Sequence, residues 1–334
     1  MSVVVTGASG HVGANLIRSL IAAGRPVRAM IHNERLGLDG LDIDYVEGDV
    51  RDPASLVKAF DGAEIVFHLA AMISISGDHG GRVQAINVRG VRNVAEAALE
   101  VGARRMVHVS SIHAFGLDDR SAPLDETRPR SLEAHEPAYN ISKNAGEVEL
   151  RRVIDRGLDA TIVNPTGIVG PYDYRPSRMG RVLLQLYRRR LPALTPGGFD
   201  FVDVRDVVSG LLSAETRGET GENYILGGRF VSVVEIAEIA ERITGVPRPR
   251  LVTPMWLAQA TAPFAELAGR MLRREPLYTR ESLSALRANP DIRHDKAAAA
   301  LGHAPRSFEE TVRDTYAWFA CHGVIPPDAV RSPA

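Results

Sequence analysis

Short runs of β-branched and aliphatic residues alternate with longer stretches of helical periodicity through the first half of the chain. Strands are predicted at Val3–Val5, Val27–Ile31, Ile43–Val46, Ile65–Leu69, Met106–Val109 and Ala160–Val163. Helices are predicted between them at Val12–Ala23, Pro53–Phe60, Gly81–Val101 and Pro137–Arg156. Strands that alternate with helices in this way form βαβ units. The pattern therefore predicts an α/β fold with a doubly wound parallel (Rossmann) sheet, whose ligand lies beyond the carboxyl ends of the strands.

The alternation ends after Pro165, which predicts a second, smaller domain. Pro and Gly cluster at Gly170–Pro176 and Thr195–Gly198, and mostly helical patterns follow. The helices expected there are Arg178–Arg189, Val204–Glu215, Ser232–Thr244, Trp256–Leu272 and Phe308–Cys321. We expect a dinucleotide-binding domain over residues 1–165, to which residues 201–228 return. Residues 166–200 and 229–325 are then a mostly helical substrate-binding cap.

Charge and composition narrow the class of partner. The 334 residues include 40 Lys plus Arg and 41 Asp plus Glu, for a net charge of −1. A balanced charge offers no attraction to nucleic acid or to an acidic membrane surface, so a small-molecule substrate is expected. The single cysteine, Cys321, cannot form an intramolecular disulfide, which fits a cytoplasmic protein. No cluster of Cys, His or carboxylates has the spacing of a metal site.

The strongest local motif is a strand that runs into a turn with three glycines. Val3 to Gly13 has the sequence VVVTGASGHVG, and helical periodicity begins directly afterwards. Glycines permit a tight turn and a close approach of the backbone, and the free N–H groups of the following helix can hold a pyrophosphate. The residues predicted to bind a dinucleotide in this turn are Gly7, Ser9, Gly10, His11, Val12 and Gly13.

A tyrosine and a lysine four residues apart suggest acid–base chemistry. The chain has eight tyrosines and three lysines (Lys58, Lys143 and Lys296), and only Tyr139 is followed by a lysine at this spacing. Residues i and i+4 share one face of a helix, so Lys143 could lower the pKa of the phenol from its usual value of about 10. Ser111 follows the fifth predicted strand, and its hydroxyl could donate to a substrate oxygen while Tyr139 transfers the proton. Ser110 is the alternative.

With these residues the chain resembles the extended short-chain dehydrogenase/reductase superfamily, which is also called the NAD-dependent epimerase/dehydratase superfamily. It is most similar to the dihydroflavonol 4-reductase-like and 3β-hydroxysteroid dehydrogenase-like members. The motifs that carry the resemblance are the glycine turn, Asp49-Val50, His68-Leu69-Ala70-Ala71, Asn87-Val88-Arg89-Gly90, Val109-Ser110-Ser111, Tyr139 with Lys143, Asn164-Pro165-Thr166, Gly170-Pro171 and Asp295 to Gly302.

The resemblance implies catalytic roles for Ser111, Tyr139 and Lys143, with Tyr139 and Lys143 also touching the cofactor and Lys143 holding the nicotinamide ribose. It further implies cofactor contacts from Asp49, Val50, Leu69, Ala70, Ala71, Pro165 and Thr166. Relatives of this kind also suggest a homodimer, built on the segments Gly81–Val101 and Pro137–Arg156 of each subunit.

Cofactor choice depends on the residues after the second strand. An acidic residue there would bind the ribose of NAD, and a basic one would accommodate the phosphate of NADP. No acid stands in the immediate position, and His32, Asn33 and Arg35 favour NADP. Glu34 keeps NAD open as the alternative.

Nucleotide-sugar enzymes of the family typically carry an arginine where Phe199 stands, and a diphosphate would be poorly held without it. Apolar side chains are available to line a substrate pocket instead: Met72, Ile73, Phe115, Tyr172 and Phe199. We therefore expect hydride transfer between a nicotinamide and a ketone, aldehyde or alcohol on a small, largely apolar substrate. An NAD-dependent epimerase or dehydratase of a sugar or sugar nucleotide is the alternative, and a non-catalytic dinucleotide sensor is a third class. The intact Ser111, Tyr139 and Lys143 count against the third.

Overall fold

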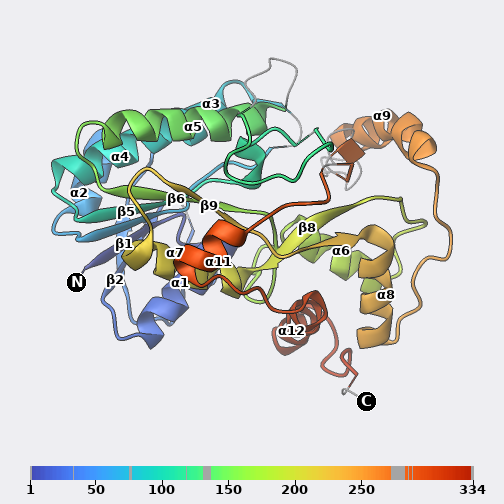
Figure 1. Cartoon of the computed structure of the whole chain (residues 1–334). Coiled ribbons are helices and arrows are strands. Elements are labelled where there is room, and N and C mark those ends of the chain that lie inside the picture. The colour runs from blue at the N-terminus through green and yellow to red at the C-terminus, as the bar shows by residue number, and fades with distance from the viewer. Residues whose placement is uncertain are drawn as a thin grey trace.

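The computed structural model describes residues 2–32, 34–74, 77–117, 119–130, 137–271, 283–284, 286–287 and 289–331. Seven parallel strands form its main sheet in the order β3-β2-β1-β4-β5-β6-β9 (Figure 1). Their bounds are Val3–Thr6 for β1, Val27–Ile31 for β2, Asp44–Glu47 for β3, Ile65–His68 for β4, Arg105–Val109 for β5, Ala160–Pro165 for β6 and Asn223–Leu226 for β9. The predicted α/β fold with a doubly wound parallel sheet is confirmed.

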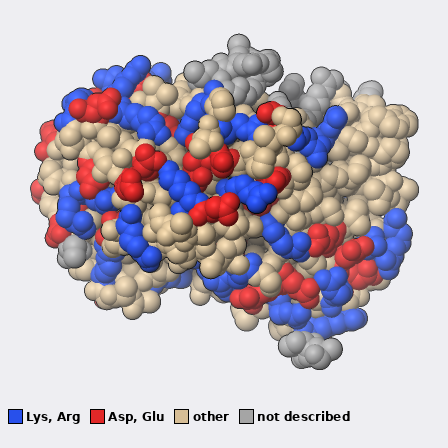
Figure 2. All heavy atoms as spheres, viewed as in Figure 1, with Lys and Arg blue, Asp and Glu red and all other residues tan. Residues whose placement is uncertain are grey.

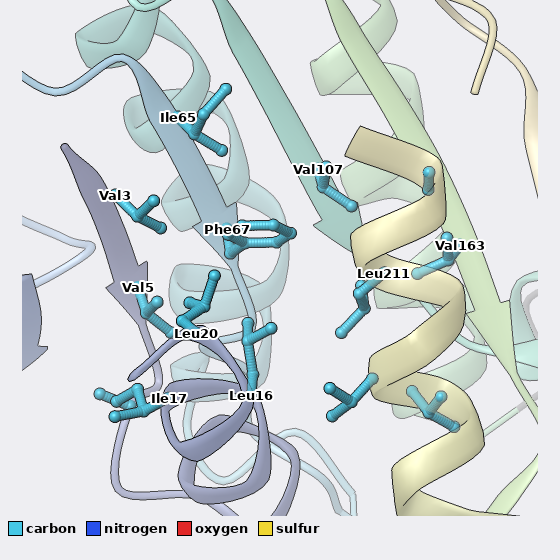
Figure 3. Close-up of a cluster of buried hydrophobic side chains, with 14 of the residues drawn as sticks. Val3, Val5, Leu16, Ile17, Leu20, Ile65, Phe67, Val107, Val163 and Leu211 are labelled. Atoms are coloured by element: carbon cyan, nitrogen blue, oxygen red, sulfur yellow. The ribbon is translucent and has the colours of Figure 1, made fainter. Parts of the chain in front are cut away.

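Helices cover both faces of this sheet, because successive residues of its strands point to opposite faces and are apolar on both. Val3 and Val5 of β1 pack with α1 and α7, whereas Val4 packs with the helices of the opposite face. One face carries α1 (His11–Ala22), α7 (Val204–Arg217) and α11 (Asp295–Leu301). The other carries α2 (Pro53–Phe60), α3 (Arg82–Gln84), the π-helical turn η1 (Ala85–Arg89), α4 (Gly90–Glu100) and α5 (Ala138–Ile154). Figure 3 shows the first cluster, in which side chains of the sheet meet Leu16, Ile17 and Leu20 of α1 and Leu211 of α7.

A second, smaller layer has its own core. Strands β7 (Gly167–Val169), β8 (Gly198–Asp203) and β10 (Arg229–Ser232) form a three-stranded sheet in the order β10-β8-β7. The helices beside it are α6 (Arg178–Tyr187), α8 (Val233–Thr244) and α12 (Phe308–Cys321), and α9 (Met255–Met271) lies between α8 and α12 in the chain. A short 3-10 turn, η2 (Ile112–Ala114), follows β5. Apolar residues of α6, α8 and α12 form one buried cluster under this sheet.

The structure differs from the sequence predictions in four features. The small sheet and strand β9 were not predicted, because short strands among Pro and Gly carry little periodicity. Helix α11 was also not predicted. The predicted helix Gly81–Val101 is interrupted by η1, where Asn87 lies against Gly146 of α5; a Cβ on Gly146 would lie only 2.2 Å from the Asn87 carbonyl oxygen.

The surface agrees with a balanced charge. Figure 2 shows acidic and basic side chains interspersed over the visible face, without a large area of one sign. Among the described helices, none combines the length and the hydropathy that a membrane span requires.

Candidate active site

The glycine turn joins β1 to α1 at the carboxyl edge of the sheet. Gly7 has a left-handed φ of +67°, and a Cβ on it would lie 2.6 Å from the backbone nitrogen of Ala70, after β4. A Cβ on Gly13 would lie 2.4 Å from the carbonyl oxygen of Gly7. Both positions therefore require glycine for steric reasons, and they hold the turn directly against the ends of β1 and β4.

The N-terminus of α1 is open toward solvent. Gly10 is its N-cap residue, no side chain caps it, and the first turn contains no acidic residue. Helix N–H groups in this state, with the positive end of the helix dipole, are suited to an anion such as a pyrophosphate. The imidazole of His11 is bonded to the segment after β7, since its Nε2 lies 3.0 Å from the carbonyl oxygen of Pro171, and Val12 packs against the core of the sheet.

A cavity of about 210 Å³ adjoins this turn. Its lining comes from three segments that are far apart in the sequence: Ser9, Gly10 and His11; Glu34 and Leu36; and Tyr172, Tyr174 and Arg175. The arrangement is a site in which the pyrophosphate and adenosine half of a dinucleotide would fit.

The basic residues predicted to select NADP do not line this cavity. His32 Nε2 lies 3.1 Å from Oδ2 of Asp49, whose pKa is lowered to about 2 chiefly by its hydrogen bond with Arg51. The guanidinium of Arg35 lies over the ring of Tyr45, 4.4 Å from its centre. Asn33 lies outside the described residues.

The remaining predicted cofactor residues lie at the ends of neighbouring strands. Leu69, Ala70 and Ala71 follow β4, and the backbone N–H of Ala70 lies 3.3 Å from Thr6 Oγ1. Pro165 ends β6, and Thr166 N–H donates to the Leu226 carbonyl at 3.3 Å. Val50 is buried and follows β3, where a Cβ on Gly90 would lie 2.9 Å from its side chain.

Ser111, Tyr139 and Lys143 converge at the carboxyl end of β5. The side chain of Ser111 is close enough to the phenol of Tyr139 to lower its pKa, which favours the phenolate. Lys143 Nζ donates to the carbonyl oxygen of Val109 at 3.0 Å, and burial lowers the pKa of this lysine to about 8. The three residues therefore share one edge of the sheet with the glycine turn.

The charge that acts on Tyr139 differs from the expected one. Burial raises the pKa of Tyr139, and the hydrogen bond from Ser111 and the positive charge of Arg178 partly oppose this effect. Lys143 was predicted to lower the pKa of this tyrosine, but its ammonium is directed to Val109. Arg178 begins α6 in the smaller layer, so no local pattern around Tyr139 could have indicated it.

Two aromatic rings continue from Tyr139 toward the smaller layer. The ring of His113 meets that of Tyr139 edge-on with centres 5.6 Å apart, and stacks on Phe199 at 5.8 Å. Burial, with Arg178, lowers the pKa of His113 to about 4, so this ring is neutral at pH 7.

The other residues expected to line a substrate pocket are dispersed. Phe115 is fully buried beneath the guanidinium of Arg130, and Tyr172 lines the cavity beside the glycine turn. Met72 is half-buried, and Ile73 is exposed. Of the five apolar candidates, Phe199 is the one connected to Tyr139, through the ring of His113 that lies between them.

A buried polar network supports the site from behind, and sequence reasoning missed it. Asn164, in β6, donates through Nδ2 to the carbonyl oxygen of Ser111 at 3.0 Å and to Glu147 Oε1 at 2.8 Å. Asn223, in β9, donates to Glu147 Oε2 at 3.0 Å. Glu147 lies one helical turn after Lys143, and this i+4 spacing was the available signal.

A doubly wound sheet with a glycine turn, an open helix N-terminus and a Ser-Tyr-Lys group along one edge defines a Rossmann-fold, dinucleotide-dependent enzyme. Comparison with known proteins gives the family. Residues 3–227 match the model of the NAD dependent epimerase/dehydratase family. The chain belongs to this family, the extended short-chain dehydrogenases/reductases, whose members act on CH–OH or carbonyl groups.

Three relatives illustrate the likeness. The chain is 38% identical over 331 residues to sterol demethylase protein B of Methylococcus capsulatus, which covers 97% of this chain and 100% of that protein. It is 34% identical to a Synechocystis protein provisionally named dihydroflavonol 4-reductase, with 96% of this chain and 95% of that protein covered. The crystal structure of gox2253 superimposes with a TM-score of 0.84 at 34% identity, and covers 96% of this chain and 98% of its own.

Proposed function

We propose that this chain is an NAD(P)-dependent oxidoreductase that interconverts a ketone or aldehyde and an alcohol on a small, largely apolar substrate. The observation that carries the proposal is the convergence of Ser111 and Tyr139 at the carboxyl edge of the sheet, close enough for the Ser111 side chain to lower the pKa of the phenol, with Lys143 anchored at Val109. Two hydroxyl groups at one point can hold a carbonyl oxygen and deliver a proton to it.

The residues around the glycine turn fit a dinucleotide. Gly7 and Gly13 leave no room for a side chain, the first turn of α1 offers uncapped N–H groups, and the adjoining cavity extends toward the end of β2. A bound nicotinamide supplies or accepts the hydride. In this proposal the first turn of α1 holds the pyrophosphate, Lys143 holds the nicotinamide ribose, and NADP is the preferred form.

In the reducing direction, Tyr139 donates its phenolic proton to the substrate oxygen while Ser111 donates a hydrogen bond to the same oxygen. The raised pKa of Tyr139 keeps this proton in place at neutral pH. In the oxidising direction the phenolate must accept the proton from the alcohol, and the positive charge of Arg178 favours that form.

An apolar substrate is supported by the rings next to the phenol. Phe199 stacks on His113, which burial keeps neutral, so neither ring offers a charge to a diphosphate. The name of the sterol demethylase relative points in the same direction.

The first test is a thermal-shift titration with NADPH, NADH and UDP-sugars, because a ligand that binds only the folded state raises its melting temperature. We expect a response to NADPH and none to UDP-sugars, followed by NADPH consumption with apolar ketones or aldehydes. Tyr139→Phe should abolish turnover and retain NADPH binding, whereas the control Tyr187→Phe, in α6, should retain both. Full activity of Tyr139→Phe would refute the proposal, and release of NAD on denaturation with a UDP-sugar response would favour the epimerase or dehydratase alternative.

We also propose that the enzyme is a cytoplasmic homodimer in which α4 and α5 of each subunit meet. The two helices run side by side on one face of the main sheet (Figure 1). Val148 of α5 is exposed. Light scattering should give twice the chain mass at micromolar concentration, and Val148→Asp should lower it toward that of one chain. A monodisperse monomer of the unaltered protein would rule this out.

We retain the division into a dinucleotide-binding domain (1–165 with 201–228) and a substrate-binding cap (166–200 and 229–325). The position of β9 in the main sheet and the separate apolar cluster of α6, α8 and α12 support it, whereas α11 packs on the main sheet and so belongs with the first domain.

A further inference from the structure

The cavity beside the glycine turn has a charged residue on each of two facing segments. Glu34 comes from the segment after β2, and Arg175 from the segment after β7, 141 residues away. Their side chains form an ion pair. Glu34 is the acidic residue of the cavity lining and Arg175 is the arginine. The lining also includes His11, whose imidazole is bonded to Pro171.

We infer that Arg175 selects the phosphorylated form of the cofactor, because its guanidinium is placed to leave Glu34 and bind the 2′-phosphate on the adenosine ribose of NADP. The inference rests on the proposed function, since it takes the pyrophosphate to lie on the first turn of α1. A dinucleotide held there directs its adenosine ribose toward the end of β2. Glu34 and Arg175 lie at that end of the cavity.

The two basic residues that follow β2 most closely in the sequence, His32 and Arg35, interact with other side chains. The guanidinium of Arg35 lies over the ring of Tyr45, and His32 is bonded to Asp49, which also pairs with Arg51. Neither side chain lines the cavity. A 2′-phosphate in the cavity would therefore contact Arg175 rather than Arg35 or His32.

The backbone that carries Arg175 is fixed against the loop after β2. Tyr172 has a left-handed φ of +60°, and Arg18 of α1 lies over its ring at 4.6 Å. The same arginine donates to Tyr174 Oη and to the carbonyl oxygen of Gly37, both at 2.8 Å. A Cβ on Gly37 would lie 2.4 Å from the ring of Tyr174, so the two loops are in direct contact.

The ion pair can be exchanged for a phosphate at little cost. The Arg175 side chain is 72% exposed and that of Glu34 is 54% exposed, and ion pairs so open to water are weak. Arginine and phosphate form charge-assisted, two-pronged hydrogen bonds, which are among the strong ones. NAD has a 2′-hydroxyl in place of the phosphate. Glu34 can accept a hydrogen bond from this hydroxyl while its ion pair with Arg175 stays intact.

The test measures binding of two probes to the full chain by calorimetry, without substrate. Adenosine 2′,5′-bisphosphate carries the 2′-phosphate, and adenosine 5′-monophosphate lacks it. Arg175→Gln should weaken the bisphosphate about tenfold or more and leave the monophosphate within about twofold. Glu34→Gln should strengthen the bisphosphate, because it removes a competing carboxylate. Arg35→Gln is the matched control, with the same change on the neighbouring segment, and should leave both probes within about threefold.

The outcomes separate this inference from the proposed function. If Arg35→Gln loses the bisphosphate and Arg175→Gln does not, the phosphate is bound by Arg35 and not by Arg175, and the inference is overturned while the oxidoreductase proposal stands. Equal affinity of the unaltered protein for the two probes also overturns it. If the protein binds neither probe nor NADPH, the cofactor site of the proposed function fails as well.

Discussion

The carboxylate of Glu147 accepts a 2.8 Å hydrogen bond from the side-chain amide of Asn164, and the same amide donates to the carbonyl oxygen of Ser111. Helix α5 thus supplies Lys143 on one turn and, on the next, a buried acid that fixes the segment of Ser111. Glu147 also raises the pKa of Lys143, against the lowering by burial. One buried side chain therefore connects two of the proposed catalytic residues.

Glu147→Gln should destabilise the protein by about 3 kcal/mol, because it removes the buried partner of Arg130, whose ion pair with Glu147 is 2.5 Å long. The alkaline limb of the pH–activity profile should also move to lower pH, since Lys143 loses a charge that raises its pKa. Urea unfolding and a pH–rate profile measure the two effects. The control Glu96→Gln removes an exposed partner of Arg92 and Arg156 and should cost less than about 1 kcal/mol. Equal losses in the two variants would contradict this account.

Arg178→Gln should raise the pKa of Tyr139, because it removes the positive charge that lowers it. Alcohol oxidation needs the phenolate, so its pH profile should move to higher pH. Carbonyl reduction at neutral pH needs the protonated phenol and should change less. Steady-state rates in both directions measure this, with Arg188→Gln at the end of α6 as the control. An unchanged oxidation profile would show that Arg178 does not act on the reacting tyrosine.

Gly7→Ala should abolish dinucleotide binding, because the new methyl group would lie 2.6 Å from the Ala70 nitrogen as well as require a left-handed φ. Gly24→Ala is a matched control, since Gly24 has a φ of +68° and nothing within 4 Å of its Cβ position. The control bears only the backbone strain, about 1 kcal/mol, and should bind NADPH normally. Thermal unfolding with and without NADPH compares them. Normal NADPH binding by Gly7→Ala would refute the role of this close approach.

Three buried histidines should make the protein less stable in mild acid. Burial lowers the pKa of His68 to about 3 and of His113 to about 4, and lowers that of His108 well below its usual value. Unfolded histidines bind protons below about pH 6.5, so the unfolded state binds more protons between about pH 6.5 and 4. The free energy of unfolding should therefore decrease as the pH is lowered through this window, by up to about 1.4 kcal/mol per pH unit for each histidine.

Urea unfolding at several pH values measures this slope. His108→Leu should reduce the slope, because it removes one of the three histidines that titrate. The substitution breaks no side-chain hydrogen bond, since neither ring nitrogen of His108 has a partner among the described residues. The same slope in His108→Leu and in the unaltered protein would count against the prediction.

The class of fold could be predicted from the sequence because its signals are local. The six predicted strands are present with small shifts at their ends, since a buried parallel strand is a short apolar run. The glycine turn was also recognisable, because a left-handed φ at Gly7 and the contacts of Gly13 leave no other residue possible. The spacing of Tyr139 and Lys143 placed both on one helix, α5.

The sequence by itself determined the order of the βαβ units, the position of the glycine turn and the placement of Tyr139 and Lys143 on one helix, because each depends on residues within one or two turns of chain. The tertiary structure decided which charges surround them. Arg178 reaches Tyr139 from α6, Asn164 connects Ser111 to Glu147, and Arg175 meets Glu34 across 141 residues. Electrostatic interactions depend on distance in space, and chain packing alone brings these groups together.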